Sequence, residues 1–380
     1  MRPRNELRSV KICEHGGGSQ ELLRKGVLDF SANLNPYGPP SFVLDAIREA
    51  ASDVRFYPDS DATELKLRIA ERLDCDAAQI LVAAGVSQII LLVALTFLQP
   101  QRRALFVAHT YGEYETAAKL VGAAVKKVEM PSLRINAETL ASEIRGGDVV
   151  FLCNPNNPTG QYLREDEVAL LLEAAVRKDA LLVLDEAYVD FVDDVFDALR
   201  LAEELRGRDA VEHLLVLRSF TKAFTVPGLR VGYAVGSARN ISALRLIMPP
   251  WSVGTLAQRV GCVLMSDAAV EFLKWSRTKI FEAKKRFEEK IRSKLGVTLA
   301  TDANFYLLHV GDCSGGSATA VKGKLREQGV LVRDCTSFGL PSHIRFSVRR
   351  EEENEALIAA LSSVLGDCPG WRRASSVRKS

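Results

Sequence analysis

The sequence has no long apolar run, no strong excess of one charge and no pattern of paired cysteines. Its longest apolar run, Ile89 to Leu98, has ten residues, which is too short to cross a bilayer and predicts a buried helix. The net charge of +2 is too small to indicate a nucleic-acid partner. The N-terminus has no signal-peptide pattern, so we expect a cytoplasmic protein with no membrane or nucleic-acid partner.

The seven cysteines are scattered, with no C-x-x-C pair. We therefore expect free thiols in a reducing compartment and no metal site. What the chain does have is an ordinary globular composition, 47% hydrophobic over 380 residues. That length accommodates one large domain and a smaller one.

From residue 80 onward, short apolar segments alternate with segments of helical periodicity. Strands are predicted at 79–85, 103–109, 124–130, 148–154, 180–188, 213–220 and 229–236, and helices at 87–98, 111–123, 136–145 and 164–178. This alternation predicts an α/β fold with a mostly parallel central sheet and helices on both faces. Earlier helices are predicted at 41–52 and 62–73, with Ser41 as an N-cap.

The pattern changes near 248–254, where long charged helical segments at about 255–294 precede three strands and a final helix near 351–365. We expect a smaller α/β domain there. The predicted division is an N-terminal arm at 1–40 that packs with the small domain, a large domain at 41–250, a small domain at 251–368 and a disordered basic tail at 369–380.

Lys222 and Asp185 each follow an apolar strand. The carboxyl ends of parallel strands line a ligand crevice, so the two side chains can face the same crevice. A partly desolvated lysine has a lowered pKa and can form a Schiff base with an aldehyde cofactor. Pyridoxal 5′-phosphate is the cofactor that combines a lysine imine with an acidic partner for a pyridinium nitrogen. Each residue alone would be an ordinary strand-end residue.

The segment "AAGVSQII" ends a strand at Gly85 and begins a helix near Ser87. This arrangement offers free backbone N–H groups and a positive dipole end to an anion. Gly85 permits close approach, and Ser87 can cap the helix and donate its hydroxyl. Ser219 and Arg230 can add donors to the same phosphate. A turn of this kind is common, so the signal is weak by itself.

The loop "CNPNNPTG" places Asn157 before Pro158, which biases its backbone to an extended form. Its amide can donate to the ring hydroxyl oxygen of the cofactor. Tyr111 follows a strand and can stack on a flat ring, although a lone aromatic is more often part of a core.

The order and spacing of "NPNNPTG", "DEAY" and "SFTKAF…GLRVGY" resemble those of fold-type I aminotransferases, in the histidinol-phosphate aminotransferase-like group. The resemblance implies that Lys222 is the catalytic Schiff-base lysine, with Asp185 and Tyr188 beside it in catalysis. It places Asp185 on the pyridine nitrogen, and Asn157 and Tyr188 on the ring oxygen. It also implies a homodimer with shared active sites. The implied ring and phosphate contacts are Tyr111 on the ring, the backbone of Val86 after Gly85, Ser87, Ser219 and Arg230 at the phosphate, and Tyr57 reaching the phosphate of the neighbouring subunit.

Within this group, "HGGGSQELLRKGVLDFSANLNP", "MPPWSV" and "VLVRDCTSFGL" resemble the L-threonine-O-3-phosphate decarboxylases of cobalamin biosynthesis. That likeness implies Arg345 on the substrate carboxylate and Arg333 on its phosphate, with His15, Gly16, Asn33 and Asn157 also binding the substrate. The arm reads HGGG where that family usually has HGGN, and "NPYGPP" is closer to the histidinol-phosphate enzymes. Histidinol-phosphate transamination with glutamate and 2-oxoglutarate therefore stays open, as does a non-catalytic binding protein.

Overall fold

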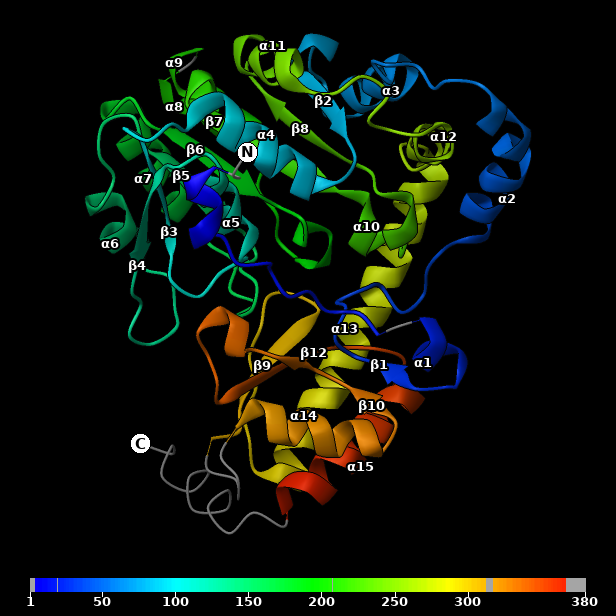
Figure 1. Cartoon of the computed structure of the whole chain (residues 1–380). Coiled ribbons are helices and arrows are strands. Elements are labelled where there is room, and N and C mark those ends of the chain that lie inside the picture. The colour runs from blue at the N-terminus through cyan, green and yellow to red at the C-terminus, as the bar shows by residue number, and fades with distance from the viewer. Residues whose placement is uncertain (1–3, 19, 207, 312–316, 367–380) are drawn as a thin grey trace.

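The chain is described by a computed structural model (Figure 1), which covers residues 4–18, 20–206, 208–311 and 317–366. The basic tail expected at 369–380 lies outside the described residues. No helix in the described part of the chain is both long enough and apolar enough to span a bilayer.

A seven-stranded sheet forms the centre of the larger part of the molecule (Figure 1). Its strands lie in the order β2-β8-β7-β6-β5-β3-β4. β8 is antiparallel to both of its neighbours, and the remaining pairs are parallel. The seven predicted strands are thus all present, in a mostly parallel sheet. Their bounds are β2 (Ile80–Ala83), β3 (Arg103–Val107), β4 (Ala124–Val128), β5 (Val149–Cys153), β6 (Leu181–Asp185), β7 (Leu214–Ser219) and β8 (Gly232–Gly236).

Helices cover both faces of this sheet because successive strand residues point to opposite sides. Phe106 and Phe151 pack in one cluster with α4, α5 and α11, whereas Leu105 and Leu152 pack in another with α6, α7 and α8. The first face carries α4 (Val86–Phe97), α5 (Glu113–Leu120) and α11 (Ala238–Ile247). The second carries α6 (Ala137–Ser142), α7 (Glu165–Arg177), α8 (Ala198–Arg206) and α9 (Arg208–Glu212).

A further cluster packs α2, α3 and α12 against β2 and β8. It includes Phe220, the first residue of the short helix that carries Lys222, and Phe224, which directly follows that helix. The bounds of these helices are α2 (Ser41–Ala50), α3 (Thr63–Leu73), α10 (Phe220–Ala223) and α12 (Thr255–Val263).

The smaller part of the molecule is built on a three-stranded sheet with the order β11-β12-β9. A cluster that includes Phe287, Tyr306 and Phe346 joins this sheet to α13, α14 and α15. The bounds are β9 (Phe305–His309), β11 (Arg333–Asp334), β12 (His343–Ser347), α13 (Asp267–Leu295), α14 (Ala318–Glu327) and α15 (Glu351–Gly366).

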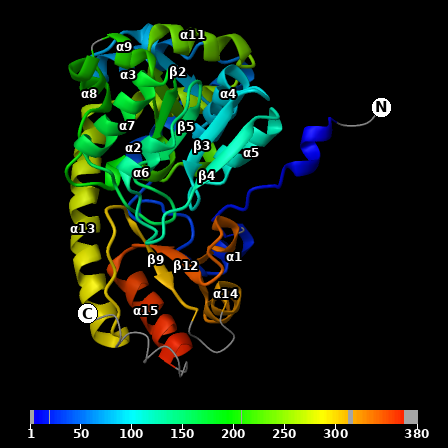
Figure 2. The same ribbon diagram turned by 90° about the vertical axis from the view of Figure 1, so that its left-hand side faces the viewer.

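The 29-residue helix α13 connects the two parts, as Figure 2 shows along one side of the molecule. Its first turns contribute Ala269 and Phe272 to the cluster around β2, and its later turns contribute Phe287 and Ile291 to the small-sheet cluster. We therefore propose that the boundary between the large and small domains lies within α13. The sequence had placed that boundary at residue 250.

The N-terminal arm contacts both parts. The 3-10 helix η1 (Asn5–Ser9) packs on α5, while β1 (Leu28–Asp29) pairs in parallel with β10 (Val330–Leu331). The short helix α1 (Gln20–Arg24) lies between them in sequence. The arm therefore contacts both parts of the molecule, and its packing with the small domain stays a proposal.

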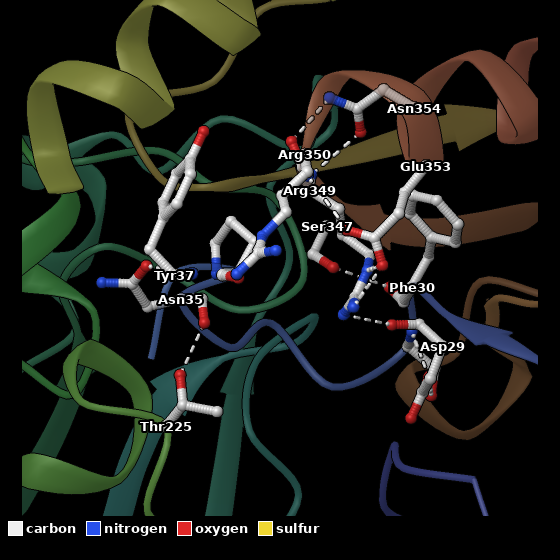
Figure 3. A network of polar contacts seen from close by, with 12 residues as sticks. Asp29, Phe30, Asn35, Tyr37, Thr225, Ser347, Arg349, Arg350, Glu353 and Asn354 are labelled. Carbon is white, nitrogen blue, oxygen red and sulfur yellow. Dashed lines mark hydrogen bonds and ion pairs between the residues drawn. The ribbon is translucent and has the colours of Figure 1, made fainter. Parts of the chain in front are cut away.

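Figure 3 shows the hydrogen bonds that hold residues 29–37 from two sides, the end of β12 and the loop after Lys222. Arg349 donates to the Asp29 carbonyl at 3.1 Å, and the Ser347 backbone N–H donates to the Phe30 carbonyl at 2.8 Å. On the other side, the Thr225 hydroxyl donates to the Asn35 carbonyl at 2.6 Å. These bonds fix the segment between β12 and the loop after Lys222.

Four details differ from the expectations. Pro40 occupies the N-cap position of α2 without a side-chain hydrogen bond, so the prediction of Ser41 as the cap is wrong. The charged segment at 255–294 forms two helices, because α12 ends at Val263 and Ser266 caps the beginning of α13. One of the three strands predicted for the smaller domain, "VLVRDC" at 330–335, is divided into β10 and β11, which belong to different sheets. Helix α14 had not been predicted.

Candidate functional site

A cavity of about 500 Å³ opens at the carboxyl ends of β5, β6 and β7, between the two parts of the molecule. Its walls come from the large sheet, the N-terminal ends of α4 and α5, the arm, and β11 and β12. Thirteen of the predicted site residues line it: His15, Gly16, Val86, Ser87, Tyr111, Asn157, Asp185, Tyr188, Ser219, Lys222, Arg230, Arg333 and Arg345.

Lys222 lies on α10, directly after β7. Its Nζ makes one long contact, 3.4 Å, to the carbonyl of Ala32. Burial lowers the pKa of the Lys222 amine to about 8, and the positive charges of Arg345 and Arg230 act in the same direction. A substantial fraction of this amine is therefore neutral near pH 7–8, which is the form that attacks a carbonyl carbon.

Asp185 ends β6 and is 2% exposed. It accepts hydrogen bonds from the Tyr114 hydroxyl at 2.7 Å and from the Ala187 backbone N–H at 3.1 Å. Burial raises the pKa of Asp185 to about 6, and these two donors oppose the increase. A buried carboxylate of this kind strongly favours a cationic partner, as a protonated pyridine nitrogen would be.

A set of anion donors surrounds the beginning of α4. Gly85 occupies the N-cap position with φ of +88°, and a Cβ there would lie 2.8 Å from Arg230 Nη2. Arg230 Nη2 donates to the Ser87 hydroxyl at 3.3 Å. The twelve-residue helix directs its free N–H groups to the same place, so backbone, hydroxyl and guanidinium groups can converge on a phosphate. Because Gly85 is the N-cap, the prediction that Ser87 caps this helix is wrong.

Arg333 and Arg345 are directly opposite each other in the antiparallel pair β11–β12. Arg345 is 4% exposed, donates to the Ser31 carbonyl at 2.6 Å and also contacts the Asn157 side-chain oxygen. Its Nε has no hydrogen-bond partner among the described residues, and burial lowers the pKa of this guanidinium. Two buried guanidinium groups on paired residues are favourable only when anionic groups occupy the space in front of both of them.

Arg333 is 5% exposed and contacts the arm. It donates to the Glu14 carbonyl at 2.9 Å and to the Ser337 hydroxyl at 2.6 Å, and the Glu14 carboxylate lies 3.4 Å away. The arm therefore places a carboxylate on Arg333, at the position where the sequence predicted a substrate phosphate.

The arm reaches the cavity through its glycine-rich segment. The Gly17 N–H donates to the Ser31 hydroxyl and the Gly18 N–H donates to the Asp29 carboxylate, both at 2.8 Å. A Cβ on Gly16 would lie 2.2 Å from the Ser31 carbonyl oxygen. Only glycine fits at position 16 while the arm is in this place.

Three predicted residues lie outside the cavity lining. Gly85 directly precedes the lining residue Val86, and a Cβ on it would lie 2.8 Å from Arg230 Nη2. Asn33 is fully buried between the lining residues Ala32 and Leu34, and neither of its amide atoms has a hydrogen-bond partner among the described residues. Tyr57 is 81% exposed and its ring packs on Trp251 at 4.7 Å.

The most informative residue that the sequence reasoning missed is Tyr114. It is fully buried, donates to Asp185 and stacks on Phe151 at 4.9 Å. Tyr114 lies on the first turn of α5, and its ring packs edge to face on that of Tyr111, which precedes the helix, at 5.6 Å between centroids. The spacing of the two tyrosines in the sequence was the signal that could have indicated Tyr114. Burial raises the pKa of Tyr188 to about 12, so this hydroxyl stays protonated and can donate to a ring oxygen.

Comparisons with known proteins agree with this geometry. Residues 25–361 match the family described as "Aminotransferase class I and II". The chain is 34% identical to a protein of Caldanaerobacter subterraneus subsp. tengcongensis provisionally named threonine-phosphate decarboxylase, over 94% of this chain and 95% of that one. It is 31% identical to a histidinol-phosphate aminotransferase of Caldicellulosiruptor saccharolyticus, over 91% and 94% of the two chains.

Solved structures show the same fold. The L-threonine-O-3-phosphate decarboxylase of Porphyromonas gingivalis superposes with a TM-score of 0.78 at 27% identity, over 90% of this chain and all of that one. The histidinol-phosphate aminotransferase of Sinorhizobium meliloti, solved in complex with pyridoxal-5′-phosphate, superposes with a TM-score of 0.83 at 23% identity, over 96% and 98%.

The fold is that of the fold-type I pyridoxal-phosphate enzymes. The chain belongs to the aminotransferase class I and II family, whose cofactor is pyridoxal 5′-phosphate. The cavity fits that cofactor: it holds an amine of lowered pKa, a buried carboxylate and an anion cradle that a Cβ on Gly85 would obstruct. We propose that Lys222, Asp185 and Arg230 hold its aldehyde carbon, ring nitrogen and phosphate.

Proposed function

We propose that the protein decarboxylates L-threonine O-3-phosphate to (R)-1-aminopropan-2-ol O-phosphate, as a cytoplasmic step of cobalamin biosynthesis. The observation that carries the proposal is the pair Arg333 and Arg345, opposite each other on adjacent strands and lining the same cavity as Lys222. A substrate with a carboxylate and a phosphate has one anion for each guanidinium. The decarboxylase-named relative and structural neighbour support the same choice.

Bound in the cavity, the cofactor supplies an electron sink for the substrate bond at Cα that breaks. The chain's own residues decide which bond that is, because they set the orientation of the substrate. In this proposal Arg345 binds the carboxylate deep in the cavity and Arg333 binds the phosphate nearer the arm. His15, Gly16 and Asn33 then close over the phosphate, and Arg333 exchanges Glu14 for it.

Decarboxylation replaces the carboxyl group on Cα by a proton, whereas transamination removes the Cα proton. Lys222 can hold or release that proton in either reaction, since the pKa of its amine is about 8. The reaction type therefore depends on the pose that the two arginines give the substrate. The Cα bond held perpendicular to the plane of the cofactor ring, either to the carboxylate or to hydrogen, is the one that breaks.

Two substrates separate the proposal from its closest rival. We expect purified enzyme to release CO₂ from L-threonine O-3-phosphate without any 2-oxo acid. Histidinol phosphate consumed only together with 2-oxoglutarate, with glutamate formed and no CO₂ from phosphothreonine, would overturn the proposal in favour of the aminotransferase that other relatives are named for. Turnover of neither substrate would support a binding protein.

The variant Arg333→Met tests the phosphate assignment. We expect kcat/KM for phosphothreonine to fall by about a hundredfold, because a charge-assisted hydrogen-bonded pair contributes roughly 1.5–3 kcal/mol. The much slower reaction of unphosphorylated L-threonine is the matched control, and it should be nearly unchanged. An equal loss with both substrates would show that Arg333 does not bind the phosphate.

We also propose a homodimer in which Tyr57 reaches the phosphate of the neighbouring subunit. The exposed apolar residues around it support this, since Val54, Phe56, Trp251 and Leu246 are 62%, 60%, 49% and 85% exposed. Mixing inactive Lys222→Ala chains with impaired Tyr57→Ala chains should restore one intact site in each hybrid. Activity that never exceeds the sum of the two parents would contradict shared sites.

A further inference from the structure

The arm brings two metal-ligating side chains to α5 at the mouth of the cavity. Cys13 and His15 lie in the stretch 10–18 of the arm, which has no regular secondary structure. Cys13 and His15 reach Glu113 on the first turn of α5, while Glu14 between them reaches Arg333.

The three side chains are close enough to share one ion. His15 Nε2 lies 3.0 Å from Glu113 Oε1, and one ligand atom from each of Cys13, His15 and Glu113 lies within 4.8 Å of the other two. Zinc bonds of 2.0–2.3 Å in a tetrahedron place ligands roughly 3–4 Å apart, so a small movement of the arm completes the set.

The backbone leaves room for the sulfur. Gly112 has no side chain, and a Cβ there would lie 2.8 Å from the Cys13 Sγ. The cysteine therefore approaches α5 because residue 112 is glycine. His15 also packs near the Tyr111 ring just before α5, with 6.1 Å between ring centroids. The arm therefore contacts the start of α5 through two alternate residues, Cys13 and His15.

The charges around the site suit a divalent cation. A Cys13 thiolate, Glu14 and Glu113 would carry three negative charges against the single positive charge of Arg333. A bound divalent transition metal deprotonates a coordinating thiol. Its two positive charges and that of Arg333 then balance the three negative charges.

We propose that Cys13, His15 and Glu113 form a binding site for Zn²⁺ or a similar borderline metal ion, with the fourth position open, which clasps the arm to α5. A thiolate, an imidazole and a carboxylate are the ligand types that zinc accepts together. The site differs from the expectation that the scattered cysteines bind no metal, because it uses one cysteine with residues that are distant in sequence.

The metal would compete with the proposed substrate for His15. That consequence rests on the proposed function, whereas the metal site itself does not. Binding is therefore tested without substrate, so that failure of one proposal is distinguishable from failure of the other.

The test is a titration of the holoenzyme with Co²⁺ alone, followed by its d–d absorption bands at wavelengths longer than the cofactor absorbs. We expect intense four-coordinate bands that saturate at one equivalent per chain and disappear when Zn²⁺ is added. Hydrated, six-coordinate cobalt gives only weak bands. A wild-type titration that shows only those weak bands would overturn the proposal.

Variants locate the ligands. Cys13→Ser and Glu113→Gln should each abolish the intense bands, while the half-buried thiol control Cys75→Ser should keep them. Gly112→Ala leaves all three ligands in place and should weaken Co²⁺ binding at least tenfold. Intense bands that survive in Cys13→Ser, vanish in Cys75→Ser or keep their affinity in Gly112→Ala would each overturn the assignment. The cofactor absorption of every variant reports that it is folded.

Discussion

Replacing Lys222 by methionine should stabilise the protein when its cofactor has been removed. The pKa of this amine falls by about 2.5 from its ordinary value of 10.5 to about 8, mainly because the amine is buried. Each pKa unit corresponds to about 1.36 kcal/mol. The buried ammonium therefore costs the cofactor-free protein about 3 kcal/mol at pH 7, and methionine keeps the apolar stem without that cost.

The sign of the pH dependence follows from linkage. Between pH 8 and 10.5 the unfolded chain binds a proton at Lys222 that the folded chain does not, so stability rises with pH there. Below pH 8 both states are protonated and the full cost is present. Above pH 10.5 neither is, and the advantage of Lys222→Met should disappear.

Urea unfolding of cofactor-free wild type and variant, at matched protein concentration and at several pH values, measures this difference. The control Lys274→Met replaces an exposed lysine of α13 and should change the free energy of unfolding by less than about 0.5 kcal/mol. A Lys222→Met protein that is no more stable than wild type at pH 7 would refute the reasoning that this amine is held in a desolvating site.

Three further substitutions test the cavity. Tyr114→Phe removes a donor to the Asp185 carboxylate, so the pKa of Asp185 should rise above about 6; the acidic limb of the kcat–pH profile should move to higher pH, and an unmoved limb would contradict the link. Gly85→Ala puts a methyl 2.8 Å from Arg230 at φ of +88°, so cofactor affinity should fall at least tenfold, as fluorescence titration of the cofactor-free protein would show. Arg345→Lys keeps the charge but loses the planar fork, and kcat/KM should fall about a hundredfold; a loss below threefold would argue against a bidentate carboxylate.

That Asp185 and Lys222 lie in one cavity could be predicted from the sequence, because local rules fix their positions. Asp185 and Lys222 each follow an apolar strand, and parallel strands bring their carboxyl ends to one edge. The cavity at that edge therefore contains both residues. The cradle at Gly85 follows from a strand-to-helix turn that can be read from a few consecutive residues.

What could not be predicted depends on contacts between distant segments. The contact between Glu14 and Arg333 joins residues 319 positions apart. The contact between Cys13 and Glu113 joins the arm to α5, which packs on the large sheet. Residues 10–18 of the arm form no helix or strand, so no local pattern indicates where they dock. Tyr114 was missed for a different reason: its apolar neighbours resemble those of any core aromatic, and only the fold shows that Asp185 is its partner.

The covalent bond proposed between the cofactor and the Lys222 amine provides the most direct test of the whole account. Borohydride reduction of the holoenzyme, followed by proteolysis and mass spectrometry, should find a pyridoxyl phosphate adduct on the peptide that contains Lys222. An adduct on any other lysine, or none on a protein that binds the cofactor, would contradict the central claim.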